Sequence, residues 1–240
     1  MNITVINGSA KKGSTDHLKT LFLEPFQGRA KITEYDLPQD GPKFCTGCTN
    51  CFLKGETFCG DAAVMQNIEA DLRQADLIVM TSPTYVLHTT GAMKNLLDHL
   101  GYRFMPHRPA EEMFHKRAVI ITQCVGAGAR AAAKDIRDSL SWWGISTIGV
   151  FSKPLMEDIV WDRLSPKRQK FLVRNIQKLS ARFAKIDYSK PAPVGLLVRI
   201  KFLFCRAIQK SILKTNEQTI DGQYWAEKGW LGTERPWKVS

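Results

Sequence analysis

The chain has 240 residues, of which 44% are hydrophobic, and a formal net charge of +11. This length and composition exclude a disordered or fibrous chain and predict one α/β domain with room for an extension. No apolar run is long enough for a transmembrane helix and no signal-peptide pattern opens the sequence, so we expect a cytoplasmic protein. Six cysteines in such a compartment favour metal binding or redox chemistry over disulfides.

Short apolar runs alternate with amphipathic segments along most of the chain. The apolar runs predict strands at residues 3–6, 31–35, 77–80, 118–121 and 145–151. The amphipathic segments predict helices at residues 18–23, 62–74, 91–99, 127–143 and 167–186. This alternation predicts a five-stranded parallel sheet with helices on both faces, and a ligand site outside the carboxyl ends of its strands.

The loop after the first strand has the residue types of an anion site. Its hydroxyl and amino side chains include Ser9, Lys11, Ser14 and Thr15. They precede a predicted helix N-terminus, where free N–H groups and the helix dipole attract negative charge. The glycine spacing matches a Walker A loop, but Ser14 replaces the nucleotide-binding lysine. Hydroxyls there favour a single phosphate monoester, and a plain β–α turn without a ligand is the alternative.

Two further loops end strands of the predicted sheet. Residues 82–86 and 123–128 are rich in small, hydroxylic or glycine residues, so we expect them to form one composite site with the first loop. Residues 126–131 also fit the G-x-G-x-x-A pattern of dinucleotide-binding folds. That fingerprint needs an acidic residue at the end of the next strand, and residues 145–153 contain none. We therefore reject a Rossmann dinucleotide site.

Four cysteines lie close together between the second strand and the next helix. Cys45, Cys48 and Cys51 follow one another at three-residue steps, and Cys59 comes eight residues later. Zinc sites usually place two cysteine pairs on separate turns, whereas a compact run is more typical of iron–sulfur ligation. Plain loop residues or reactive thiols are the alternative. Cys124 and Cys205 stand apart and are interpreted as packing residues.

The chain resembles the flavodoxin-like flavoproteins, in particular the NADPH-dependent FMN reductases and the related iron–sulfur flavoproteins. The matching motifs lie at residues 7–15, 45–51, 75–76, 82–85 and 91–98. These motifs extend over residues 1 to about 150. Each motif alone is weak evidence for the family, but their order and spacing together are more specific. The resemblance implies a flavodoxin-like sheet that binds FMN, often in a homodimer.

The resemblance also implies roles for individual residues. It implies that the FMN phosphate is bound by Ser9, Lys11, Ser14 and Thr15. It implies that the isoalloxazine ring is lined by Pro83, Thr84, Tyr85 and Val86. The loop around Gly126 would close the other side of the ring. A [4Fe–4S] cluster would be held by Cys45, Cys48, Cys51 and Cys59.

The last third of the chain differs in charge from the rest. Residues 1–150 hold 16 Lys/Arg and 15 Asp/Glu, whereas residues 151–240 hold 18 and 8. We therefore expect a flavodoxin-like FMN-binding domain at 1–187 and a basic helical extension with a tryptophan-containing tail at 188–240. Residues 190–214 carry six basic residues and no acid among large aliphatic side chains. This segment either docks on the domain or on a second subunit, or lies peripherally on the inner face of a membrane; nucleic-acid binding is disfavoured.

No catalytic triad or histidine metal site stands out, which fits chemistry carried by a cofactor. The leading hypothesis is an oxidoreductase in which NAD(P)H delivers hydride to FMN, which then reduces a quinone, a flavin or a similar small acceptor. The alternative is an iron–sulfur flavoprotein that passes electrons to a protein partner. A third hypothesis is a membrane-associated binding protein whose flavin loop is vestigial.

Overall fold

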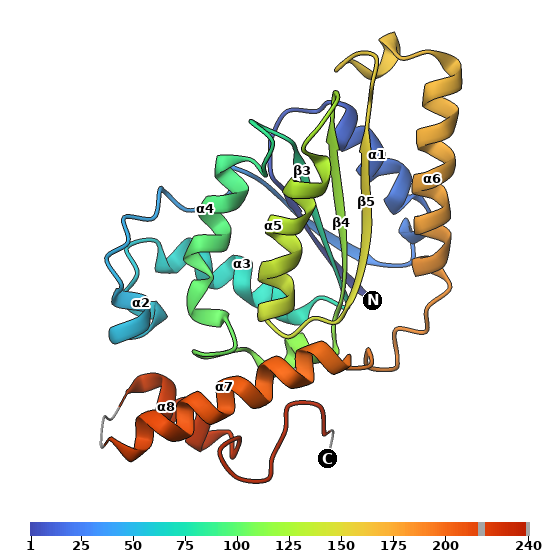
Figure 1. The fold of residues 1–240 in the computed structure, drawn as a ribbon. Coiled ribbons are helices and arrows are strands. Elements are labelled where there is room, and N and C mark those ends of the chain that lie inside the picture. Colours follow the sequence, from blue (N-terminus) through green and yellow to red (C-terminus); the bar gives the residue numbers. More distant parts are fainter. Residues whose placement is uncertain (216–218, 239–240) are drawn as a thin grey trace.

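A computed structural model describes residues 1–215 and 219–238 of the chain, and residues 216–218 and 239–240 of the predicted extension lie outside it. A five-stranded parallel sheet with the order β2-β1-β3-β4-β5 forms its centre (Figure 1). The strands are β1 (Asn2–Asn7), β2 (Lys31–Asp36), β3 (Leu77–Pro83), β4 (Arg117–Cys124) and β5 (Thr147–Pro154). This order is that of the flavodoxin-like folds, so the predicted sheet is confirmed.

Helices cover both faces of the sheet. They are α1 (Ser14–Leu23), α3 (Ala62–Gln74), α4 (Gly91–His99), α5 (Ala129–Trp142) and α6 (Pro166–Ala184), while the short α2 (Asn50–Leu53) lies away from the sheet. The side chains of β3 alternate between two apolar clusters: Leu77 and Val79 pack with α1 and α6, while Ile78 and Met80 pack with α3, α4 and α5. Strands buried on both faces explain the continuous apolar runs in the sequence.

Among the boundaries that differ from the prediction, two differ for identifiable reasons. The fifth strand was expected from residue 145 but begins at Thr147, because Ile145 is buried in the core without joining the ladder. The helix expected from residue 127 begins at Ala129, because Gly128 has a φ of +97° and ends the loop in the left-handed region. The irregular cysteine stretch also contains one short helical turn, α2.

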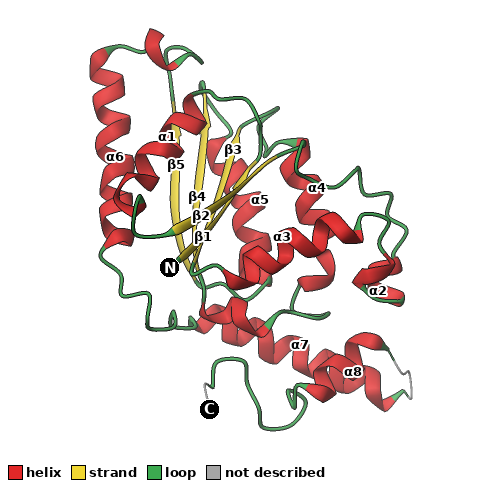
Figure 2. Ribbon diagram, turned by 180° about the vertical axis from the view of Figure 1, so that it is seen from behind, coloured by secondary structure: helices red, strands yellow, loops and turns green. Residues whose placement is uncertain are grey.

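The C-terminal extension lies across the amino ends of the strands. Helix α7 (Leu196–Lys214) runs under the sheet and α8 (Ile220–Glu227) follows it (Figures 1 and 2). Phe202, Trp225 and Trp230 are buried against Phe114 of the sheet domain. The Trp225 indole donates a hydrogen bond of 2.6 Å to the His107 carbonyl. The extension is therefore docked on the domain, and the division at residue 187 stays a prediction.

In the described part of the chain, no helix has the length and hydropathy needed to cross a bilayer.

Candidate functional site

A cavity of about 640 Å³ opens at the carboxyl edge of the sheet. Its walls come from the loop after β1, the first turns of α1, the ends of β3 and β4, and the segment 159–162 after β5. This volume is within the range of about 300–1,000 Å³ that small-molecule and cofactor sites occupy. The position is the one expected for a ligand in a doubly wound sheet.

The first loop is held tightly between β3 and α4. The Gly8 N–H donates to the Thr81 carbonyl at 2.7 Å, and a Cβ on Gly8 would lie only 2.8 Å from that oxygen. The Thr90 hydroxyl donates to the Gly8 carbonyl at 2.6 Å and accepts from the Met93 N–H at the start of α4. Only glycine fits at residue 8, and the loop is positioned before any ligand arrives.

The N-terminus of α1 points into this cavity and has hydrogen-bonding groups without a partner in the described structure. Its N-cap residue is Gly13, which offers no side-chain cap to the first-turn N–H groups. The Thr15 hydroxyl is buried and has no hydrogen-bond partner in the described structure. The Ser14 hydroxyl instead donates to the Ile159 carbonyl at 2.8 Å, which draws the segment 159–162 toward the loop. These features fit an anionic group such as a phosphate.

The lysines around this loop differ in how far their charge is compensated. Lys12 pairs with Asp36 at 2.8 Å, and this hydrogen bond raises the pKa of Lys12 although burial lowers it. Lys19 pairs with Glu34 at 2.6 Å. Lys11 forms no ion pair with any described residue, and it lines the cavity. Lys11 therefore provides the positive charge that remains available to a bound anion.

The loop after β3 is a strained, exposed turn. Tyr85 and His88 form a bridge, and between them Val86 and Leu87 have φ values of 48° and 70°. A β-branched residue in the left-handed region is strained, and such strain concentrates at functional sites. The side chain of Val86 is 94% exposed.

The loop after β4 packs against that turn through Gly128. A Cβ on Gly128 would lie 2.7 Å from the Leu87 Cα. Nothing lies within 4 Å of the corresponding position on Gly126. The Thr84 N–H donates to the Gln123 carbonyl at 2.9 Å, which joins the two loops at their base. The side-chain oxygens of Thr84 (Oγ1) and Gln123 (Oε1) are buried without a hydrogen-bond partner in the described structure.

The structure brings together part of the predicted set. The predicted residues that line the cavity are Ser9, Lys11, Ser14, Thr15, Pro83 and Tyr85. Thr84, Val86 and Gly126 lie in the flanking loops and do not line it. Gln123, which was expected only as part of the loop 123–128, also lines it. The sequence analysis missed the segment 159–162, in which the Trp161 ring lies 4.1 Å from that of His17 between ring centroids. No motif marks this segment; its only signal is a position a few residues after a buried strand.

The cysteine segment is fastened to one face of α4. Asn95 accepts a hydrogen bond from the Cys45 N–H at 2.8 Å and donates to the Lys43 carbonyl at 3.0 Å. One turn later, His99 Nε2 lies 3.0 Å from the same carbonyl, which can only accept, so this nitrogen carries the proton. The other ring nitrogen, Nδ1, lies 3.5 Å from the Cys59 sulfur. Two residues of α4 therefore position both ends of the segment.

The four thiols of this segment lie near one another without forming a closed ligand set. Cys45 and Cys48 are exposed, while Cys51 and Cys59 are half-buried. Burial raises the pKa of the Cys51 thiol, and the neighbouring thiols of the other three raise it further. No group of three possible metal ligands is gathered among the described residues. The donor chemistry suits an iron–sulfur cluster, but the positions of the sulfur atoms do not form a site.

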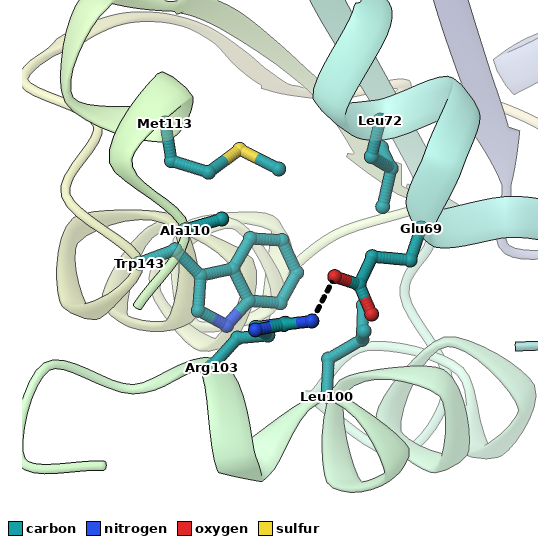
Figure 3. A pocket seen from close by; sticks show the side chains of 7 residues that line it. All are labelled: Glu69, Leu72, Leu100, Arg103, Ala110, Met113 and Trp143. Atoms are coloured by element: carbon teal, nitrogen blue, oxygen red, sulfur yellow. Dashed lines mark ion pairs between the residues drawn. The ribbon is translucent and has the colours of Figure 1, made fainter. Parts of the chain in front are cut away.

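The cysteine segment is also linked to the C-terminal extension. Arg108 is buried and donates to the Cys51 carbonyl, to Glu56 and to Asp221 of α8. A second buried ion pair, Arg103 with Glu69, lies beside it at the edge of a small cavity (Figure 3). That cavity has a volume of about 10 Å³, room for one water molecule, so it is a packing defect and not a ligand site.

Known proteins match this chain along most of its length. Residues 1–153 match the family described as NADPH-dependent FMN reductase. An iron–sulfur flavoprotein of Clostridioides difficile is 26% identical over 238 residues, which covers 95% of this chain and 99% of the relative. An NADPH azoreductase of a Bacillus species is 25% identical over 166 residues, which covers 68% of this chain and 78% of the relative.

Solved structures share the fold. That of an FMN-dependent NADH-azoreductase from Bacillus anthracis, in complex with FMN, has a TM-score of 0.60 at 12% identity, covering 77% of this chain and 100% of that chain. The family match spans most of the sheet domain, and the strand order agrees with it. The chain therefore belongs to the NADPH-dependent FMN reductase family of NAD(P)H-dependent, FMN-containing oxidoreductases.

Proposed function

We propose that the cavity at the carboxyl edge binds FMN and that the enzyme reduces a small acceptor with electrons from NAD(P)H. One observation carries the proposal. Buried side-chain oxygens of Thr15, Thr84 and Gln123 have no hydrogen-bond partner in the described structure; Thr15 and Gln123 line the cavity, and Thr84 lies in the loop beside it. Buried polar groups are nearly always satisfied, so a polar ligand that supplies their partners accounts for all three at once.

In this proposal the first loop holds the phosphate. The first-turn N–H groups of α1, the Thr15 hydroxyl and the Lys11 ammonium supply donors and charge, with Ser9 at the entrance of the loop. Ser14 contributes its backbone N–H, because its hydroxyl is bound to Ile159. Charge-assisted hydrogen bonds of this kind are about twice as strong as neutral ones.

The isoalloxazine ring would lie along Pro83 and Tyr85, with the turn at Thr84 and Val86 beside it and the loop of Gly126 opposite. Bound FMN supplies the redox chemistry: it takes a hydride from NAD(P)H and passes two electrons to the acceptor. The chain itself places the ring, and Gln123 offers a side-chain amide to its polar edge. Tyr85 is half-exposed at the mouth, where a quinone, a flavin or an azo compound could approach from solvent.

Titration of the apoprotein with FMN tests the phosphate site. We expect Thr15→Val to weaken FMN binding by about 1.5–3 kcal/mol, roughly ten- to a hundredfold in Kd, because a hydrogen bond to a charged group is lost. Thr4→Val in β1 is the matched control, since the Thr4 hydroxyl already donates to the Asp71 carbonyl at 2.8 Å and Thr4 does not line the cavity. Equal affinities of Thr15→Val and the wild type would remove this loop from the FMN site.

A second candidate function is electron transfer through an iron–sulfur cluster to a protein partner. Two observations favour it: the thiols of Cys45, Cys48 and Cys59 all raise the pKa of the Cys51 thiol, after burial as the largest cause, and the Clostridioides difficile relative is an iron–sulfur flavoprotein. Anaerobic reconstitution followed by iron and sulfide analysis tests it. We expect Cys51→Ser to lose the iron and Cys124→Ser, whose thiol lies outside the segment, to keep it. Iron far below one cluster per chain in the wild type would contradict this function.

We also propose that a second copy covers the mouth of the cavity in a homodimer. The side chains of Tyr85, Val86, Leu87 and Val125 are all substantially exposed around it, which is unusual for four neighbouring apolar residues. Sedimentation of the wild type and of Val86→Asp, which places a charge in this contact, tests the idea. A monomeric wild type would contradict it.

A further inference from the structure

Helix α7 has two apolar faces on opposite sides. One face carries Val198, Phe202, Cys205 and Gln209, which are buried against the sheet domain. The opposite face carries large apolar side chains that we call the outer stripe: Leu196, Leu197, Ile200, Leu203 and Phe204. Leu197 is 76% exposed and Phe204 is 62% exposed. Packing against the domain therefore accounts for the apolar side chains on one face of α7 and not for those on the other.

The charged side chains of α7 itself all have one sign. Residues 190–214 contain six Lys or Arg and no Asp or Glu. Arg199, Lys210 and Lys214 are exposed next to the stripe. Lys201 and Arg206 are held by the fold, through the Ser141 hydroxyl at 2.7 Å and the Trp230 carbonyl at 2.9 Å. Arg199 Nε donates to the Val194 carbonyl at 3.0 Å, whereas Lys210 and Lys214 pair with no described residue. These cations and the stripe together form a surface that is both apolar and positive.

We propose that the outer stripe of α7 binds the anionic surface of a lipid bilayer, in the plane of the interface. A helix with leucine and phenylalanine on one side and lysine and arginine at its borders has the composition of such interfacial helices. A second copy of this chain fits less well, because a two-fold contact places the same patch on both sides and would bring like charges together. Anionic headgroups instead neutralise these charges while the stripe enters the acyl boundary.

The position of α7 determines how the enzyme would sit on the membrane. The Gly195 N–H donates to the Ser146 hydroxyl at 2.9 Å and the Ala192 N–H donates to the His115 carbonyl at 2.9 Å, both at the amino ends of β4 and β5. The cavity lies at the carboxyl ends of the strands. These ends are on the side of the sheet away from α7 (Figures 1 and 2). With eight residues in β4 at about 3.3 Å each, roughly 26 Å separate the two edges. The helix would act as a tether, and the cavity would face the aqueous side and not a quinone dissolved in the bilayer.

Flotation with vesicles tests the proposal on the full-length, flavin-loaded protein. We expect binding to vesicles of equal parts phosphatidylserine and phosphatidylcholine, weaker binding at high salt, and little binding to phosphatidylcholine alone. Leu197→Ser with Phe204→Ser should reduce the vesicle affinity at least about tenfold, since two apolar side chains no longer enter the interface. Phe171→Ser on the basic helix α6 is the matched control, and its binding should stay as in the wild type.

Three results would overturn the proposal. The first is that the wild type does not bind anionic vesicles at low salt. The second is that the double variant binds them as well as the wild type does. The third is that the wild type binds no vesicles but forms a dimer, and that the double variant is a monomer. The last result would assign the outer stripe to a second copy of the chain. Retained flavin and an unchanged melting temperature show that each variant is folded, so a loss of vesicle binding reports on the surface itself.

Discussion

The amino and carboxyl edges of the sheet differ in how their side chains are packed. At the amino edge, aromatic rings of α7 and α8 interlock, with Phe202 and Trp225 at 4.9 Å between centroids, and the Trp225 indole and the Tyr224 hydroxyl both donate hydrogen bonds to backbone carbonyls. At the carboxyl edge, Thr15, Thr84 and Gln123 keep buried oxygens without partners, and Val86 holds a strained backbone. The amino edge is closed by aromatic packing, whereas the carboxyl edge contains a cavity in which a bound ligand can supply missing hydrogen-bond partners.

Substitutions at the two edges should therefore differ in their effects on stability and on FMN affinity. A change at the amino edge should lower the free energy of unfolding and leave the affinity for FMN intact. A change at the carboxyl edge should weaken FMN binding and leave the apoprotein as stable as before or more so. Loss of function through misfolding is thereby distinguished from loss of a ligand contact.

The largest expected effect is at Phe202. Phe202→Ala should lower the free energy of unfolding by about 3–5 kcal/mol, because a fully buried ring is replaced by a cavity. Phe204→Ala, two residues further on the same helix but exposed, should change it by no more than about 0.5 kcal/mol. Urea denaturation of both variants measures the difference. Similar losses in the two would mean that the outer stripe, too, is packed against protein.

Two buried glutamines allow the same substitution at both edges. The Gln209 amide N–H donates to the Pro106 carbonyl at 2.6 Å, while its Oε1, like that of Gln123, has no partner in the described structure. Gln209→Leu should therefore cost about 1–3 kcal/mol of unfolding free energy through the lost donor, and it should spare FMN binding. Gln123→Leu removes an oxygen that has no partner in the described structure. It should leave the apoprotein at least as stable and weaken FMN binding by about 1 kcal/mol. A destabilised Gln123→Leu apoprotein would contradict the contrast between the edges.

The strained turn at Val86 should be stabilised by a residue that adopts the left-handed conformation more readily. Val86→Asn should raise the free energy of unfolding of the apoprotein by about 1 kcal/mol, because asparagine adopts the left-handed region at lower cost. Val160→Asn is the control, since Val160 has a φ of −87° and is also exposed. Thermal unfolding compares them. If Val86→Asn brings no more gain than the control, the turn is not strained.

The smallest effect concerns the acid stability of the network between the cysteine segment and the extension. Burial alone would raise the pKa of Glu56, but a backbone N–H, Arg103 and Arg108 together hold it below the ordinary value of 4.5. A carboxyl with a depressed pKa adds stability above its unfolded pKa, and this is lost as the pH falls below about 4.5.

Glu56→Gln should therefore flatten the decline of the unfolding free energy in acid, and Glu24→Gln should not. Urea midpoints from neutral pH downward check this. Parallel curves for the wild type and Glu56→Gln would show that Glu56 titrates normally.

The sequence predicted those parts of the fold that depend on residues close together in the chain. Buried strands produce apolar runs, and the break at Asn7 and Gly8 followed by hydroxyl residues predicted the loop that now lines the cavity. The segment 159–162 escaped prediction because its place depends on the Ser14 hydroxyl, 145 residues away in the chain. The contact of Gly128 with Leu87 was missed as well, since two loops from different strands must first be assembled.

The direction of α7 could not be predicted either, because both of its sides are apolar. Phe202 and Phe204 look alike in the sequence, yet one is buried and the other exposed. Only the position of Phe114 and the tryptophans decides which side packs on the domain.

The central claim is that the cavity at the carboxyl edge binds FMN with its phosphate on the loop of residues 9–15. Calorimetric titration of the apoprotein with FMN and with riboflavin, which lacks the phosphate, tests it most directly. The account predicts that FMN binds at least about a hundredfold more tightly, because several charge-assisted hydrogen bonds depend on the phosphate. In Thr15→Val this preference should shrink about tenfold or more. Equal affinity for the two compounds would contradict the claim.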